Sequence, residues 1–155
     1  DALQPLSRPD VNGFFEAIEA SGLSVHLRGS RWTYPLVNAG HVAGIALLVG
    51  AVLPMDLRVL GLVNGPDPRR IVRFLRPFAI AGAVLAVACG LTLFAAQATD
   101  YVQSPWFQAK MALLSAAVLN ALWHLRAHPL PRRAALLSLV LWPGVLFCGR
   151  MIGYG

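Results

Sequence analysis

The chain has little charge for its length and very few acidic residues. Only 13% of its 155 residues are charged, and just seven of these are Asp or Glu. A soluble globular domain usually carries about 25% charged residues. Because 57% of the residues are hydrophobic, the composition argues against a soluble domain and predicts a chain that is largely surrounded by lipid.

Signatures of catalysis are also missing. The sequence contains no CxxC motif, no glycine-rich phosphate loop, no paired carboxylates and no nucleophile beside a base. The two cysteines, Cys89 and Cys148, both fall in apolar stretches, where cysteine more often packs than forms a disulfide. We therefore expect no catalytic activity of the chain's own.

What the sequence does contain is four long apolar stretches. They cover residues 36–55, 78–98, 111–123 with its flanks, and 134–147 with an extension to residue 154. A spanning helix needs roughly 20 mostly apolar residues. The predicted fold class is therefore all-α, with a four-transmembrane-helix bundle as one domain over residues 32–155.

Residues 1–31 are predicted to be an N-terminal segment at the outer face. Within it, Val11, Phe14, Phe15 and Ile18 recur at helical spacing and predict a short amphipathic interfacial helix. Such a helix lies along the outer membrane surface or docks on the bundle. The sequence leaves both arrangements open.

Basic residues alternate between the connections. Five arginines lie between the first two stretches and three between the last two, whereas residues 99–105 carry Asp100 and no basic residue. The positive-inside rule then predicts cytoplasmic basic loops and both termini outside, in a bacterial inner membrane. The expected partners are the lipid bilayer, with its anionic inner leaflet, and other membrane subunits. Nucleic acid is not an expected partner.

Polar residues inside the predicted spans indicate a candidate site. At 1.5 Å per residue, His41 lies roughly 10 Å below the aromatic outer boundary, and Lys110 and Arg150 lie about 6 Å below it. Asn38 shares a helical face with His41. Intramembrane ionisable residues are costly and mark functional sites. A histidine with two cations and no acid predicts an anionic ligand, such as the propionates of a haem.

The cofactor hypothesis is haem b, with His41 as the axial ligand and Asn38, Lys110 and Arg150 as further cofactor-binding residues. A structural hydrogen bond is the alternative for His41, and snorkelling to the interface is the alternative for the two cations. His124 is the weaker second metal ligand. It lies roughly 15–18 Å from His41 along the membrane normal, whereas two axial histidines need one depth.

Two further interpretations of the polar residues and cysteines in the predicted spans stay open. A contact between His124 and Asp56 near the cytoplasmic boundary is the plain structural role for that histidine. Cys89 and Cys148 fall at about the depth of His41, and thiolates with imidazole suit Cu(I).

Several motifs carry a resemblance over nearly the whole chain. They are YPLVNAGHVAGIALLVG at 34–50, DLRVLG at 56–61, PWFQAK at 105–110, NALWH at 120–124 and GR at 149–150. The set resembles a family of small bacterial four-helix integral membrane proteins and, less specifically, the copper-resistance D membrane proteins and the four-helix b-type cytochromes. The resemblance implies the four-helix fold and no particular activity. It picks out His41, Asp56, Arg58, Lys110, His124 and Arg150, and does not include the cysteines.

Three classes of function fit these observations. The first is an integral membrane subunit that binds haem b or a related redox cofactor near the outer face for electron transfer. The second is a non-catalytic structural subunit of a larger membrane complex. The third is a copper or small-solute permease.

Overall fold

The computed structural model describes residues 9–124 and 131–154, and within these ranges all regular structure is helical. The elements are α1 (Pro9–Glu19), α2 (Gly22–Gly29), α3 (Thr33–Leu60), α4 (Pro68–Ala96), α5 (Ala98–Gln103), α6 (Pro105–Trp123), α7 (Arg132–Met151) and the short 3-10 helix η1 (Ile152–Tyr154).

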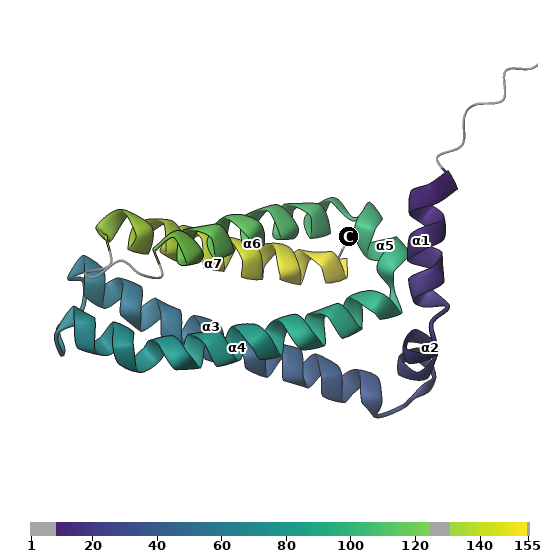
Figure 1. Cartoon of the computed structure of the whole chain (residues 1–155), viewed down its shortest axis with the longest axis horizontal. Coiled ribbons are helices and arrows are strands. Elements are labelled where there is room, and N and C mark those ends of the chain that lie inside the picture. Colours follow the sequence, from purple (N-terminus) through teal and green to yellow (C-terminus); the bar gives the residue numbers. More distant parts are fainter. Residues whose placement is uncertain (1–8, 125–130, 155) are drawn as a thin grey trace, which may run out of the picture.

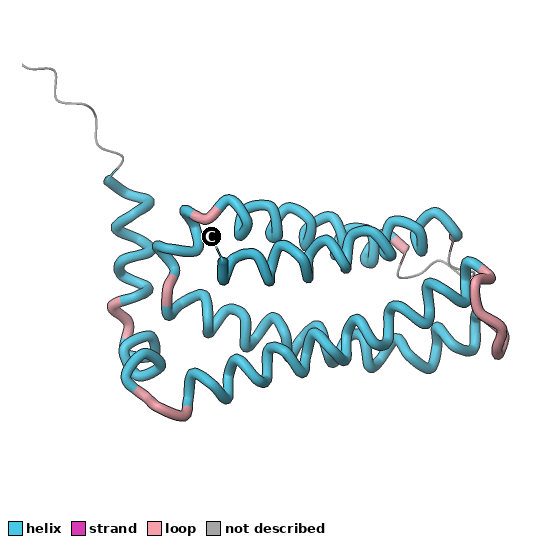
Figure 2. The backbone as a smooth tube through the Cα atoms, turned by 180° about the vertical axis from the view of Figure 1, so that it is seen from behind, coloured by secondary structure: helices cyan, strands magenta, loops and turns pink. Residues whose placement is uncertain are grey.

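The long helices α3, α4, α6 and α7 run alongside one another, and α1 and α2 lie across one end of the bundle (Figures 1 and 2). They associate as two pairs, because α3 packs mainly on α4 and α6 mainly on α7. Contact between α3 and α7 joins the pairs, whereas α4 and α6 hardly touch. The bundle is therefore closed on one side and open on the other.

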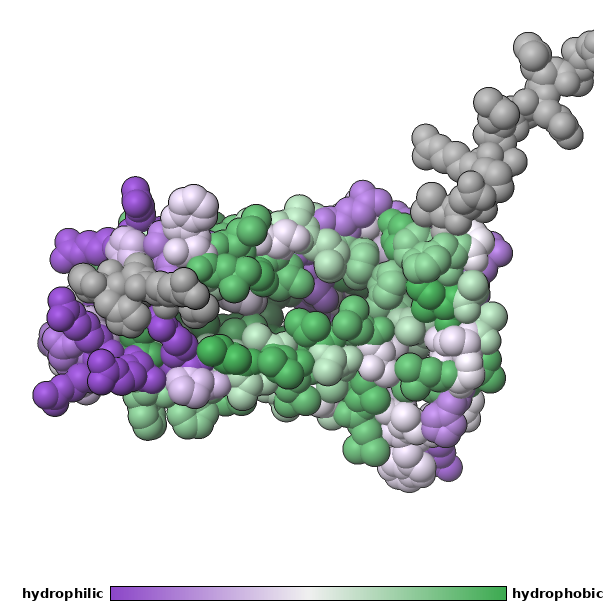
Figure 3. All heavy atoms as spheres, viewed as in Figure 1, coloured by the Kyte–Doolittle hydropathy of each residue, from purple (hydrophilic) through white to green (hydrophobic). Residues whose placement is uncertain are grey.

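Three helices are long and apolar enough to cross a membrane, namely Thr33–Leu60, Pro68–Ala96 and Arg132–Tyr154. Their outward faces carry many exposed large apolar side chains, which form the hydrophobic middle of the molecule in Figure 3. Exposed apolar surface of this extent suits contact with lipid. The predicted all-helical fold is thus confirmed for the described residues, and three of its helices could cross a membrane. Helix α6 is not among the three, so the fourth span remains a prediction.

Local chemistry explains where the long helices begin and end. Asp67 caps α4, since its Oδ1 accepts a hydrogen bond from the Arg69 backbone N–H at 2.8 Å, and Pro68 follows at the first helical position. Ser104 caps α6 in the same way. Gly61 ends α3 with a φ of 79°, a left-handed conformation that glycine adopts without steric cost.

Small residues at the interface allow the backbones of α3 and α4 to approach each other closely. Gly44 and Gly82 face each other's backbones, and Ala86 lies beside Gly44. All three are buried. In the sequence, Gly40 and Gly44 in one apolar stretch, and Gly82, Ala86 and Gly90 in the next, recur every four residues, a pattern that predicts such an approach. The structure confirms it for Gly44, Gly82 and Ala86.

The N-terminal helices dock on the bundle. Ser24 of α2 is completely buried, and its Oγ lies 2.8 Å from the Ala95 carbonyl oxygen of α4. Arg28 donates to the Ala96 carbonyl at 2.9 Å and to the Glu19 carbonyl at 2.7 Å. Of the two arrangements that the sequence left open, the structure has the docked one.

Helix α1 is held to α5 and α4 by one hydrogen bond and by aromatic packing. The Glu19 carboxylate accepts a hydrogen bond from the Thr99 backbone N–H at 2.7 Å, and this bond lowers the pKa of Glu19. Phe15 packs edge-on against Phe94, which stacks in turn on Phe107. These contacts join α1 to the end of the bundle where α4 ends and α6 begins.

Candidate functional site

His41 lies in the third turn of α3 and is half-buried against α4. Its Nδ1 lies 2.7 Å from the Ala86 carbonyl oxygen. A carbonyl oxygen only accepts hydrogen bonds, so the bond assigns the proton to Nδ1. In the neutral ring Nε2 then carries the free lone pair, which is the form of imidazole that binds a metal.

The missing side chain of Gly90 leaves the space in which the imidazole ring packs. A Cβ atom at position 90 would lie 3.0 Å from His41 Cε1 and 3.3 Å from Nδ1, which is tighter than ordinary packing. Ala86 and Gly90 are one turn apart on α4, so one supplies the carbonyl and the other the space. The four-residue spacing of Gly82, Ala86 and Gly90 predicts helix packing only. The sequence signal for the second role of Gly90 is depth, because Gly90 lies seven residues before Gln97 and His41 lies seven residues after Tyr34.

Lys110 approaches the same region from the other helix pair. Its side chain is half-buried and extends past Gly149 of α7, with Nζ 3.8 Å from the position that a Cβ atom would take there. Its charge is close enough to act on the His41 imidazole. Within the described part of the chain, neither a hydrogen bond nor an opposite charge acts on its ammonium group.

The open side of the bundle carries a groove. Figure 3 shows the surface hollowed between the lower helix pair and α6, with hydrophilic surface inside a mostly hydrophobic rim. This groove follows from the arrangement in which α4 and α6 hardly touch. His41, from the α3–α4 pair, and Lys110, from the α6–α7 pair, are the two predicted site residues that the structure brings near each other.

The other predicted site residues on this half are placed differently. Asn38 is exposed on α3. Arg150 is exposed, donates from Nη2 to the Tyr154 hydroxyl at 2.7 Å, and has its Cζ 4.9 Å from the centre of the Tyr154 ring. This pairing at the end of α7 resembles the snorkelling arrangement, in which an arginine reaches toward the interface.

His124 caps the far end of α6, at the opposite end of the bundle from α5 (Figure 1). Its Nδ1 lies 2.9 Å from the Asn120 carbonyl oxygen. The suggested partner Asp56 is instead buried, with 3% of its surface exposed, beside the Ser138 hydroxyl of α7. Among the described residues, Asp56 Oδ2 has no hydrogen-bond partner. No sequence pattern predicts that Asp56 and Ser138 are neighbours.

The cysteines do not join a ligand cluster. Cys89 Sγ lies 3.0 Å from the place where a Cβ atom of Gly40 would be, and Cys148 is buried in α7. Over the described ranges, no three side chains of His, Cys, Asp or Glu come together as a metal site.

Comparison with protein-family models, curated proteins and solved structures finds no match for the chain.

Proposed function

We propose that this protein is an integral membrane subunit that binds haem b, or a related tetrapyrrole, in the groove between the α3–α4 and α6–α7 pairs. The observation that carries the proposal is the 2.7 Å hydrogen bond from His41 Nδ1 to the Ala86 carbonyl. Histidines that bind metals usually donate their other ring N–H to a carbonyl or carboxylate, which fixes the ring and makes the ligand nitrogen more basic.

A haem suits the sparse donor set better than a bare metal ion does. The macrocycle provides four nitrogen ligands itself, so His41 Nε2 is sufficient as the axial protein ligand. Lys110, half-buried and unpaired among the described residues, supplies a positive charge for a propionate. Bound haem iron would pass single electrons, and the protein would set its position and exclude water.

The proposal includes a fourth span formed by α6. Helix α6 has 19 residues, or about 28 Å at 1.5 Å per residue, against a hydrocarbon core of roughly 30 Å. It packs along α7, which is one of the three apolar helices. If α7 crosses a bilayer, its neighbour lies in the same layer. Together with the arginine pattern, this supports four spans in a bacterial inner membrane with both termini outside.

Cysteine labelling in right-side-out and inverted vesicles tests this topology. In a background with Cys89→Ala and Cys148→Ala, we expect Asn64→Cys and Pro131→Cys to react only from the cytoplasmic side and Asp100→Cys only from the outside. The reason is that positively charged connections are retained in the cytoplasm. Reaction of Asp100→Cys from the cytoplasmic side alone would overturn the proposed orientation.

A visible spectrum of the purified protein tests the cofactor. We expect a Soret band in the oxidised protein and sharp bands in the reduced-minus-oxidised difference spectrum. The protein should be produced with added haem precursor, so that a deficit in supply does not imitate a deficit in binding. A haem-free protein that also lacks bound metal would contradict the proposal and favour the non-catalytic structural subunit, in which the His41–Ala86 bond only joins α3 to α4.

A further inference from the structure

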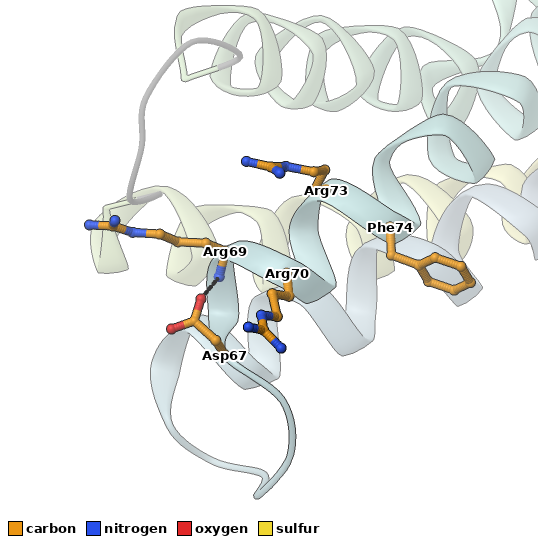
Figure 4. Close-up of a pocket in the computed structure, with 5 residues that line it drawn as sticks. All are labelled: Asp67, Arg69, Arg70, Arg73 and Phe74. Atoms are coloured by element: carbon orange, nitrogen blue, oxygen red, sulfur yellow. Dashed lines mark hydrogen bonds between the residues drawn. The ribbon is translucent and has the colours of Figure 1, made fainter.

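A separate cluster of arginines lies at the start of α4, in the connection predicted to be cytoplasmic. Arg69, Arg70 and Arg73 line a pocket together with Asp67 and Phe74 (Figure 4). Among these five residues the one hydrogen bond that involves a side chain is the bond that Asp67 Oδ1 accepts from the Arg69 backbone N–H. The Asp67 carboxylate is thus engaged with the helix end, and the three guanidinium groups extend in different directions from the start of α4 without bonding to one another (Figure 4).

The pocket is electropositive and open to solvent. Three arginines and one aspartate give it a net charge of +2, and all three arginine side chains are exposed. Guanidinium groups present a planar fork of N–H donors that matches the oxygens of a phosphate. The cluster therefore suits an anionic group with several oxygen atoms.

Exposed apolar side chains continue from these arginines along two faces of α4. Phe74 and Phe78 are 68% and 44% exposed, lie one turn apart, and hold their rings 5.6 Å from each other. Beyond them the same helix exposes further large apolar side chains, namely Ile80, Val84, Val87 and Leu91. This surface contacts none of the other described helices closely enough to be buried, although it belongs to a helix long enough to cross a membrane.

From this juxtaposition we infer that α4 carries a binding site for an anionic phospholipid. Arg70 and Arg73 bind the headgroup phosphate, one acyl chain lies against Phe74 and Phe78, and the other lies along Ile80 and Val84, which follow Arg73 on its own face of the helix. The length of this surface suits an acyl chain. The 11 residue steps from Arg73 to Val84 rise about 16 Å along the helix, which is close to half of a hydrocarbon core of roughly 30 Å. The inference relies on the membrane placement of α4 and is independent of the cofactor at His41.

Native mass spectrometry in a neutral detergent tests the site. The protein is titrated with phosphatidylglycerol and, separately, with phosphatidylcholine of the same chain length. We expect tighter binding of phosphatidylglycerol, and an approximately tenfold loss of its affinity in Arg70→Gln/Arg73→Gln. The matched control is Arg132→Gln/Arg133→Gln, which removes the same charge from exposed positions at the start of α7 and should retain wild-type affinity.

Two further arms separate a lipid site from a plain anion site. Phe74→Ala should weaken binding of the long-chain lipid, because it removes apolar contact. Inorganic phosphate at millimolar concentration should not displace the lipid. Equal losses in both double-arginine variants, displacement by inorganic phosphate, or undiminished lipid binding in Phe74→Ala would each overturn the inference. Because these measurements need no haem, they fail or succeed separately from the spectrum that tests the cofactor.

Discussion

Gly44→Ala in α3 is expected to destabilise the helix bundle by about 1 to 3 kcal/mol, the usual cost of overpacking a tight contact. A Cβ atom at position 44 would lie 2.5 Å from the Ala86 backbone nitrogen and 2.9 Å from the Gly82 carbonyl oxygen. Both neighbours are backbone atoms, so no side chain can rotate away. The helices α3 and α4 would have to separate, with loss of contact along their whole length.

Thermal unfolding of the purified protein in detergent, followed by far-UV circular dichroism, measures this effect. Gly50→Ala provides a matched control in the same helix, because nothing lies within 4 Å of a Cβ atom at position 50. There the alanine should stabilise the helix by up to about 1 kcal/mol through its higher helix propensity. Equal melting temperatures for the two variants would contradict the close approach of α3 and α4.

The α3–α4 interface was predictable because its determinant is a sequence pattern. Gly40 and Gly44 on one stretch, and Gly82, Ala86 and Gly90 on the next, are spaced by four and so form one small face on each helix. Close approach requires such a face regardless of the neighbouring helices. The pattern could therefore identify the contact, although it could not give the register of one helix against the other.

The ends of the bundle were less predictable for a physical reason. Ser21 and Gly22 predict the end of the first short helix, and α1 does end just before them at Glu19. The sequence pattern does not predict α2, which begins at Gly22 with Ser21 as its cap. Short helices are only marginally stable alone. Helix α2 depends on tertiary bonds such as those from Ser24 and Arg28 to the last carbonyls of α4. Nothing local in the sequence indicates those partners.

Counting residues along each predicted span could give the depth of the site residues, but not which of them lie together. It put His41, Lys110 and Arg150 near one level, but depth does not determine which way each helix is rotated. In the structure Lys110 lies near enough to His41 for its charge to act there, whereas Arg150 is engaged with Tyr154. The Ala86 carbonyl was not predictable either, since it depends on how α3 is set against α4.

His41→Ala is expected to abolish haem binding, with loss of the Soret band. The substitution removes the proposed axial ligand and leaves space beside Gly90. Added imidazole should enter that space and restore much of the absorbance, and such a rescue requires a folded site. Restoration therefore distinguishes a lost ligand from a lost fold. The measurement is the haem-to-protein ratio after purification, with and without imidazole.

Companion variants sharpen this test. Lys110→Gln should weaken haem retention roughly tenfold, the effect of losing one charge-assisted hydrogen bond. Gly90→Ala should shift the spectrum, because its Cβ atom would lie 3.0 Å from His41 Cε1 and displace the ring. His124→Ala is the matched control, since it removes an imidazole at the opposite end of the bundle. Loss of haem in the His124 variant equal to that in the His41 variant would contradict a site with His41 as the axial ligand in this groove.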